Sequence, residues 1–126
     1  MSISQRKIGL LIIAWALIGS ALAAPPIPLA SGEYSFEMRD EEFPNLPGTP
    51  IRVLVNGTHI KIVSESPGST TFPAGTVVDE GFIIWNLQKG QWIVGDKDSD
   101  ATAVEVGGCS EGPAIIDLDN RVYWWC

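Results

Sequence analysis

Residues 51 to 64, IRVLVNGTHIKIVS, place Asn56-Gly57 between two runs rich in β-branched residues. Asn-Gly in such a setting is the strongest short-range signal for a two-residue type I′ hairpin turn. This turn would set Arg52 opposite Lys61. Because neighbouring side chains on a strand point to opposite faces, one face of the hairpin is predicted to enter a core, and it carries Ile51, Val53, Val55, Ile60 and Ile62. The segment therefore requires a β-sheet with one buried face.

The same period of two recurs on both sides of the hairpin. In residues 32–38, GEYSFEM, apolar and polar residues alternate, and this strand is expected beside the hairpin, where Glu33 and Glu37 would offset its paired basic residues. Further strands are predicted within residues 75–88, 91–96, 101–106, 114–118 and 121–125, with turns at Lys89-Gly90 and Asp119-Asn120. A two-residue turn at Lys89-Gly90 would set Leu87 opposite Trp92 and Trp85 opposite Val94, in an aromatic core cluster with Ile83. About eight or nine short strands without a helical period indicate a small antiparallel barrel, and a β-sandwich is the alternative.

The N-terminus has the three-part layout of a secretory signal peptide. Arg6 and Lys7 precede an uncharged apolar run, which ends in small residues before Ala24. The run is short for a membrane anchor. The sequence therefore predicts a signal peptide over 1–23, an extended proline-rich leader over 24–31 and one β domain over 32–126. Export to the periplasm or the extracellular space is expected, with no stable membrane insertion after cleavage.

Two cysteines, Cys109 and Cys126, lie in the exported part. An oxidising compartment favours one intramolecular disulfide between them. Sixteen residues lie between the two cysteines. Closing such a loop stabilises a fold by roughly 3 kcal/mol in the chain-entropy model. We therefore expect the disulfide to close the domain near its C-terminus.

Charge restricts the class of partner. After loss of Arg6 and Lys7, six basic residues remain against fifteen acidic ones, a formal charge of −9. Such a charge disfavours nucleic acid and anionic lipid, and it favours basic proteins or cations. A protein partner with a basic surface is the prediction, and the oligomeric state stays open.

Few residues offer catalytic or metal-binding chemistry. His59 is the only histidine, and no G-x-S-x-G nucleophile motif is present. Asp79-Glu80 and Glu41-Glu42 are interpreted as solvated turn residues. The sequence thus predicts no enzyme, no catalytic residue, no metal and no cofactor.

Two local patterns stay open as minor alternatives. Residues 96–100, DKDSD, alternate aspartates as calcium loops do, but Ala101 and Gly107 stand where an EF-hand needs Gly and Glu, so a solvated hairpin loop is expected. Asn56-Gly57-Thr58 matches a glycosylation acceptor. The turn explains that segment without a sugar.

Binding residues are predicted in two places. The loop over 39–50 is longer than most connections in a compact domain, so it is either functional or loose. Its predicted binding residues are Asp40, Glu41, Glu42 and Phe43. In the final hairpin, a two-residue turn places Trp125 on the core face with Ala114, Ile116, Leu118 and Tyr123, and Trp124 on the other face. The outward tryptophan could be covered by the leader, buried in a dimer or left as a contact surface. Trp124 is the predicted contact residue.

These features favour an exported acidic module that binds a protein without catalysis. In size, acidity and a single disulfide the chain resembles small exported β-barrels that inhibit lysozymes, although it carries none of their sequence motifs. That resemblance of class implies inhibition of an envelope or secreted enzyme as one form of the binding function. A carrier of a small apolar ligand is the alternative, and a structural component of an envelope assembly is a third reading.

Overall fold

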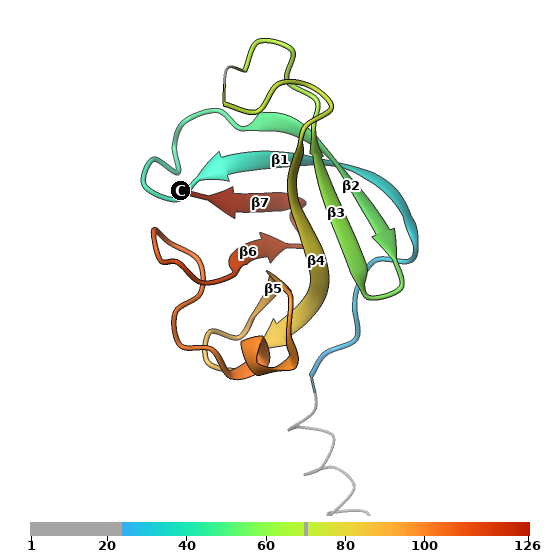
Figure 1. Cartoon of the computed structure of the whole chain (residues 1–126), viewed down its shortest axis with the longest axis vertical. Helices are drawn as coiled ribbons and strands as arrows, with labels where there is room; N and C mark the ends of the chain where they lie inside the picture. The colour runs from blue at the N-terminus through green and yellow to red at the C-terminus, as the bar shows by residue number, and fades with distance from the viewer. Residues whose placement is uncertain (1–23, 70) are drawn as a thin grey trace, which may run out of the picture.

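The computed structural model describes residues 24–69 and 71–126, and the predicted signal peptide lies outside them. Seven strands follow one another along the chain, namely β1 (Gly32–Asp40), β2 (Thr49–Asn56), β3 (His59–Ser64), β4 (Val77–Asn86), β5 (Gln91–Gly95), β6 (Ala114–Asp117) and β7 (Val122–Trp125). A short 3-10 helix, η1 (Asp98–Thr102), lies between β5 and β6 (Figure 1). No helix within the described part of the chain is long and apolar enough to cross a membrane.

The strands form one sheet that closes into a ring, in the order β1 to β7 of a closed barrel. Consecutive strands pair antiparallel, whereas β7 closes the ring by pairing in parallel with β1. The parallel pair follows from the odd number of strands, because strands that alternate in direction leave the first and the seventh running the same way. The all-β prediction is confirmed, and one ring replaces the sandwich alternative. The wholly antiparallel expectation is wrong at this one pair.

The count of eight or nine strands was too high because no strand forms over 101–106. Ala101 and Thr102 belong to η1 instead. The buried carboxylate of Asp100 accepts the backbone N–H of Asp96 at 2.9 Å and that of Lys97 at 3.3 Å. Such local side-chain bonds compete with a strand ladder, and here they stabilise a tight turn.

The two long hairpins are each displaced by two residues from the predicted register. Asn56 faces His59, so Gly57 and Thr58 form the first turn, and only Gly57 has a positive φ (62°), as a type II′ turn requires. Lys61 now faces Leu54 rather than Arg52, so the expected pair of like charges does not occur. In the second hairpin Trp85 faces Trp92, which leaves a four-residue turn and an exposed Leu87 where a core residue was expected.

Other predictions about the sheet hold. β1 lies beside β2, as expected, although Glu33 faces Leu54 and Glu37 faces Pro50. In the final hairpin Ile116 faces Tyr123, the predicted register. The ring is joined least extensively on the two sides of β6. This strand pairs with β5 only at Ile93–Ile115 and Val94–Ala114, and with β7 only at Ile116–Tyr123 and Asp117–Val122.

The core fills the inside of the ring. Every member of the predicted inner face of the first hairpin is buried, and the cluster also includes Phe36, Met38, Ile83, Trp92, Val94, Ile116, Leu118 and Tyr123. Trp85 packs edge-to-face on Trp92 with ring centroids 5.1 Å apart. Trp125 packs against this cluster from β7, as predicted.

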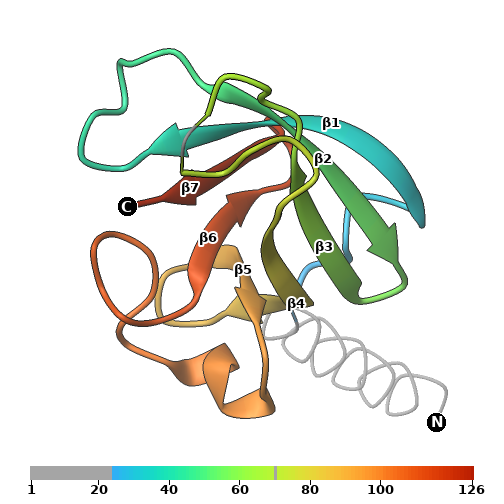
Figure 2. The same ribbon diagram turned by 45° about the horizontal axis from the view of Figure 1, so that its top comes forward.

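The proline-rich leader is anchored at the end of the sheet away from the C-terminus (Figures 1 and 2). Ile27 and Leu29 pack against the core cluster. The hydroxyl of Ser31 accepts the N–H of Gly57 at 2.9 Å, and Tyr34 donates its hydroxyl to the carbonyl of Ala30 at 2.6 Å. The leader therefore covers the β2–β3 hairpin end and does not cover the tryptophans of β7.

Candidate binding groove

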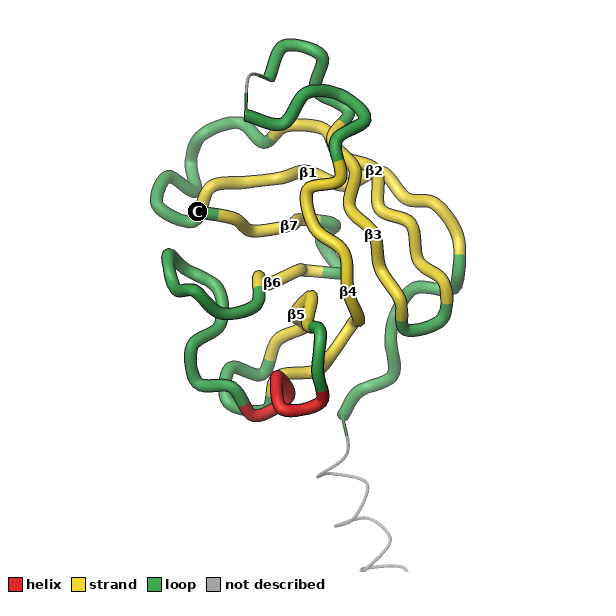
Figure 3. The backbone as a smooth tube through the Cα atoms, viewed as in Figure 1, coloured by secondary structure: helices red, strands yellow, loops and turns green. Residues whose placement is uncertain are grey.

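An open groove of about 860 Å³ lies beside the first half of β4. It forms because β5 ends at Gly95, opposite Phe82, while β4 continues back to Val77 (Figure 3). Gly81 is required at this junction, because a Cβ there would meet the carbonyl oxygen of Gly95. The other wall comes from the segments on either side of η1 and from the start of β6. We call this hollow the acidic groove, and it is lined by Val78, Asp79, Glu80, Val94, Gly95, Asp96, Lys97, Ser99, Asp100, Ala103, Glu105, Glu111, Gly112, Pro113, Ala114 and Tyr123.

Carboxyl groups dominate the lining of the acidic groove. Six acidic side chains face one basic side chain, that of Lys97, and the acids are Asp79, Glu80, Asp96, Asp100, Glu105 and Glu111. Glu80 also lies 3.1 Å from His59, measured from carboxylate oxygen to Nε2. Walls of one charge sign concentrate the field in a cleft and attract the opposite charge. The groove therefore suits a cationic group.

Asp79 and Tyr123 form a polar pair on the inner side of the sheet. Asp79 sits opposite the fully buried Ile62 on β3, so its side chain points to the inner face of the ring. The Tyr123 hydroxyl donates to Asp79 Oδ2 at 2.7 Å, and the backbone N–H of Glu80 donates to Oδ1 at 2.8 Å. Burial raises the pKa of Asp79, and these two hydrogen bonds counteract part of that rise. Burial and the nearby Asp79 charge also raise the pKa of Tyr123, which keeps the phenol a donor.

Asp100 has a structural role in the groove wall. Its side chain is buried, and burial by itself would raise its pKa. The backbone N–H groups of Asp96 and Lys97 and the charge of Lys97 outweigh burial, so the pKa of Asp100 lies below its ordinary value. An ionised Asp100 holds the turn before η1 in place. Asn86 braces η1 from β4 by donating to the carbonyls of Asp100 and Ala103, each at 2.9 Å.

A smaller hollow of about 200 Å³ adjoins the acidic groove. The half-buried side chains of Phe72, Trp124 and Trp125 line it, and we call it the aromatic pocket. Phe72 meets Trp125 edge-to-face with ring centroids 5.4 Å apart. The two hollows share four lining residues, Val78, Gly112, Ala114 and Tyr123. The two hollows therefore lie next to each other, and we call the pair the trough.

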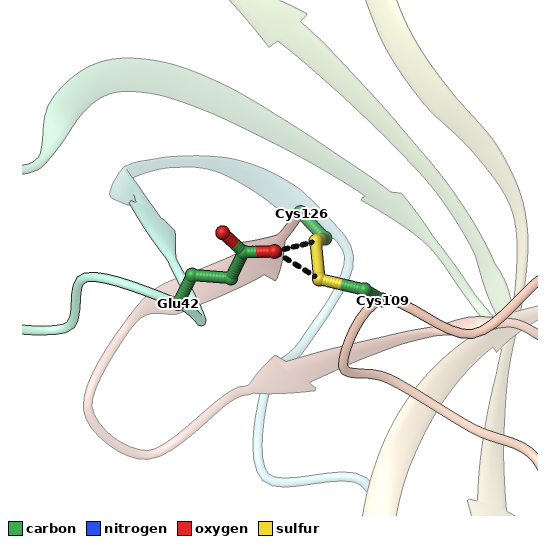
Figure 4. Close-up of side chains that lie close together, drawn as sticks. All are labelled: Glu42, Cys109 and Cys126. Carbon is green, nitrogen blue, oxygen red and sulfur yellow. Dashed lines mark hydrogen bonds between the residues drawn. A yellow bond between two sulfur atoms is a disulfide. The ribbon is translucent and has the colours of Figure 1, made fainter.

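The predicted disulfide between Cys109 and Cys126 is present at the rim of the aromatic pocket, with Cα atoms 5.2 Å apart. Glu42 Oε1 lies 2.9 Å from Cys109 Sγ and 3.5 Å from Cys126 Sγ (Figure 4). These three side chains are also the one group of potential metal ligands found within the described residues. Because both sulfurs are bonded to each other, neither is the thiolate that binds a metal.

The structure brings most of the predicted binding residues to the disulfide end of the molecule. Asp40 and Trp125 pair across β1 and β7, and the Glu41 N–H donates to the Trp125 carbonyl at 2.9 Å. Glu42 contacts the disulfide, and Trp124 lines the aromatic pocket. Phe43 is 56% exposed and lines neither hollow.

The acidic groove itself was missed by sequence reasoning. Asp79 and Glu80 had been interpreted as solvated turn residues, yet both lie within β4. The expected hairpin loop over 96–100 is instead a capped turn that enters η1 and forms part of the groove wall. The available signal was the repeated placement of acids next to predicted strand ends, which local patterns could not assign to a single site.

No protein-family model, curated protein or solved structure matches this chain.

Proposed function

We propose that this protein is an exported, non-enzymatic binding module that holds a basic protein partner through the acidic groove. The observation that carries the proposal is the lining of that groove, six acidic side chains against Lys97. A formal charge of −9 on the exported chain would speed the encounter with a cationic surface and make the association sensitive to salt. Inhibition of a basic envelope or secreted enzyme is one form that this binding would take.

The distribution of the acids favours a protein over a small cation. Beyond the groove, Asp40, Glu41 and Glu42 continue the negative surface at the disulfide end, where Glu41 packs beneath Gly107 and Gly108. A single small cation would contact only a fraction of these groups. A carrier of apolar ligands is less favoured, because seven of the sixteen residues that line the larger hollow are charged.

The residues in and around the groove also favour binding over catalysis. The histidine, His59, lies on the outer face of β3, with Nε2 3.1 Å from a Glu80 carboxylate oxygen and its ring centroid 5.9 Å from that of Phe82. Its contacts within the described residues, Glu80 and Phe82, include no hydroxyl or thiol nucleophile. The groove contributes charge and shape rather than an activated nucleophile.

The test is a pull-down of exported proteins on the immobilised mature chain at low and high salt, followed by measured affinities for the captured proteins. We expect basic proteins whose affinity falls as salt rises. The variant Glu105→Gln/Glu111→Gln should weaken binding, whereas Glu33→Gln/Asp119→Asn, which changes the net charge equally outside the groove, should bind nearly as the native chain does. Capture of only neutral proteins with salt-independent affinity would contradict the proposal.

A further inference from the structure

We infer that the partner enters the trough as an extended segment, with a basic side chain in the acidic groove and an aromatic or aliphatic side chain in the aromatic pocket. This inference rests on the proposed function and specifies the chemistry of the partner. It depends on three observations, namely the adjacency of the two hollows, their contrast in chemistry, and an uncovered stretch of strand edge whose residue Val78 lines both.

The uncovered edge belongs to the first half of β4. β5 pairs with β4 only from Phe82 to Asn86, so within the described residues Val77–Gly81 has no strand on that side. The Ile83 N–H donates to the Thr58 carbonyl at 2.7 Å, and backbone groups alternate in direction along a strand. Asp79 and Gly81 therefore face β3, whereas the backbone of Glu80 faces the acidic groove.

At Glu80 only one of the two backbone groups on this edge, the N–H, already has a hydrogen-bond partner. Its N–H donates to Asp79 Oδ1 at 2.8 Å, while no strand of the described residues lies opposite its carbonyl. An N–H of an extended peptide can donate to that carbonyl, as in the addition of a strand to a sheet edge. Because Asp79 already accepts the N–H of Glu80, only the carbonyl of Glu80 is left to pair with an added strand. This disfavours unspecific strand pairing.

The uncovered edge of β4 contributes residues to both hollows. Val78 lines both hollows, and Glu80 lines the acidic groove. An extended chain rises about 3.3 Å per residue, and every second side chain points to the same face. A segment along β4 would therefore present its two anchoring side chains two or four residues apart. The basic one would meet Glu105 and Glu111 across the groove, and the apolar one would meet Trp124 and Phe72.

Charge complementarity and the half-buried Trp124 select this class of occupant. Lysine or arginine is the side chain that a cleft rich in carboxylates attracts. Trp124 is half-buried without belonging to the core cluster, and an aromatic side chain at the edge of a pocket is a common anchor in protein recognition. A purely cationic segment would leave the aromatic pocket empty.

The experiment pans a displayed library of random decapeptides against the purified exported chain with its disulfide intact. We expect enriched sequences that hold Lys or Arg two or four positions from Trp, Phe, Tyr or Leu. For a synthetic peptide of that type, Trp124→Ala should weaken binding by about tenfold or more, whereas Trp124→Phe should retain most of it. Leu87→Ala removes a side chain that is 58% exposed outside both hollows, and it should leave binding unchanged. Thermal melts of all variants separate loss of the contact from loss of the fold.

The outcomes separate this inference from the proposed function. Replacing the basic residue of the peptide with Gln should weaken binding to the native chain, and much less to Glu105→Gln/Glu111→Gln. Enriched peptides with basic residues only, and unchanged binding to Trp124→Ala, would overturn the two-part segment and leave the acidic binding module standing. Enriched peptides without a basic residue would overturn both. Failure to enrich any sequence would overturn the extended segment, while the pull-down still decides the proposed function.

Discussion

At the scale of single residues, the contact between Tyr123 and Asp79 links the core to the acidic groove. Tyr123→Phe removes the donor to Asp79 Oδ2 without emptying the site. A hydrogen bond to a charged acceptor contributes about 1.5–3 kcal/mol, so we expect the free energy of unfolding to fall by roughly that amount near neutral pH. Urea unfolding of both proteins measures the difference.

The pH dependence of this difference has a definite sign. Burial already raises the pKa of Asp79 above 3.8, and loss of the Tyr123 donor would raise it further. A carboxyl group with a raised pKa in the fold contributes stability at low pH that is lost as the pH rises through the folded pKa. The cost of Tyr123→Phe should therefore be smaller at about pH 3 than at about pH 7. Tyr34→Phe removes a bond to the neutral Ala30 carbonyl and is the control, since its cost should not change with pH. An equal cost of Tyr123→Phe at both pH values would show that Asp79 is not a charged acceptor.

At the scale of elements, the disulfide attaches the segment over 107–112 to the end of β7. That segment lines both hollows, and the chain ends at Cys126. Cys109→Ser/Cys126→Ser should lower the free energy of unfolding by about 2–4 kcal/mol, because the unfolded chain regains the freedom of the closed loop. Chemical denaturation measures this loss, and hydrogen exchange should quicken at Trp124 and Trp125, because β7 loses its covalent link to Cys109. A double variant as stable as the oxidised protein, or two reactive thiols in the folded protein, would contradict a stabilising disulfide.

At the scale of the whole molecule, the leader and the disulfide act at opposite ends of the ring. Ile27 and Leu29 are half-buried against the core cluster, so Ile27→Ala/Leu29→Ala should cost about 2–3 kcal/mol of stability through loss of buried apolar area. Pro25→Ala/Pro28→Ala changes exposed residues of the same leader and should cost much less. Denaturant unfolding of the two double variants shows whether the leader stabilises the fold by packing against the core. Equal stability of both variants would show that the leader does not contribute to the core.

Which side chains of a strand face the core was largely predictable, because side chains alternate between the two faces with a period of two. Both long hairpins were predicted in registers displaced by two residues, and a shift of two leaves every side chain on its own face. For this reason Val53, Ile60 and Trp85 pack in or against the core even though their predicted partners were wrong. Turn geometry was less predictable. Asn-Gly can occupy more than one position of a hairpin turn, and here Gly57 takes the first central position.

The sequence by itself determined the β class, the inner face of each hairpin and the pairing of the two cysteines, since alternation and cysteine number are local or countable properties. Tertiary structure decided the ring and the groove. Asp79, Asp100 and Glu111 are far apart in the chain, and they share one hollow only because β5 stops at Gly95 while β4 continues and η1 turns the chain back. The length over which two strands pair depends on the packing of the whole ring, so no short pattern encodes it. Closure of the ring also brings Trp124 to the aromatic pocket that Phe72 lines, although Phe72 lies more than fifty residues earlier in the chain.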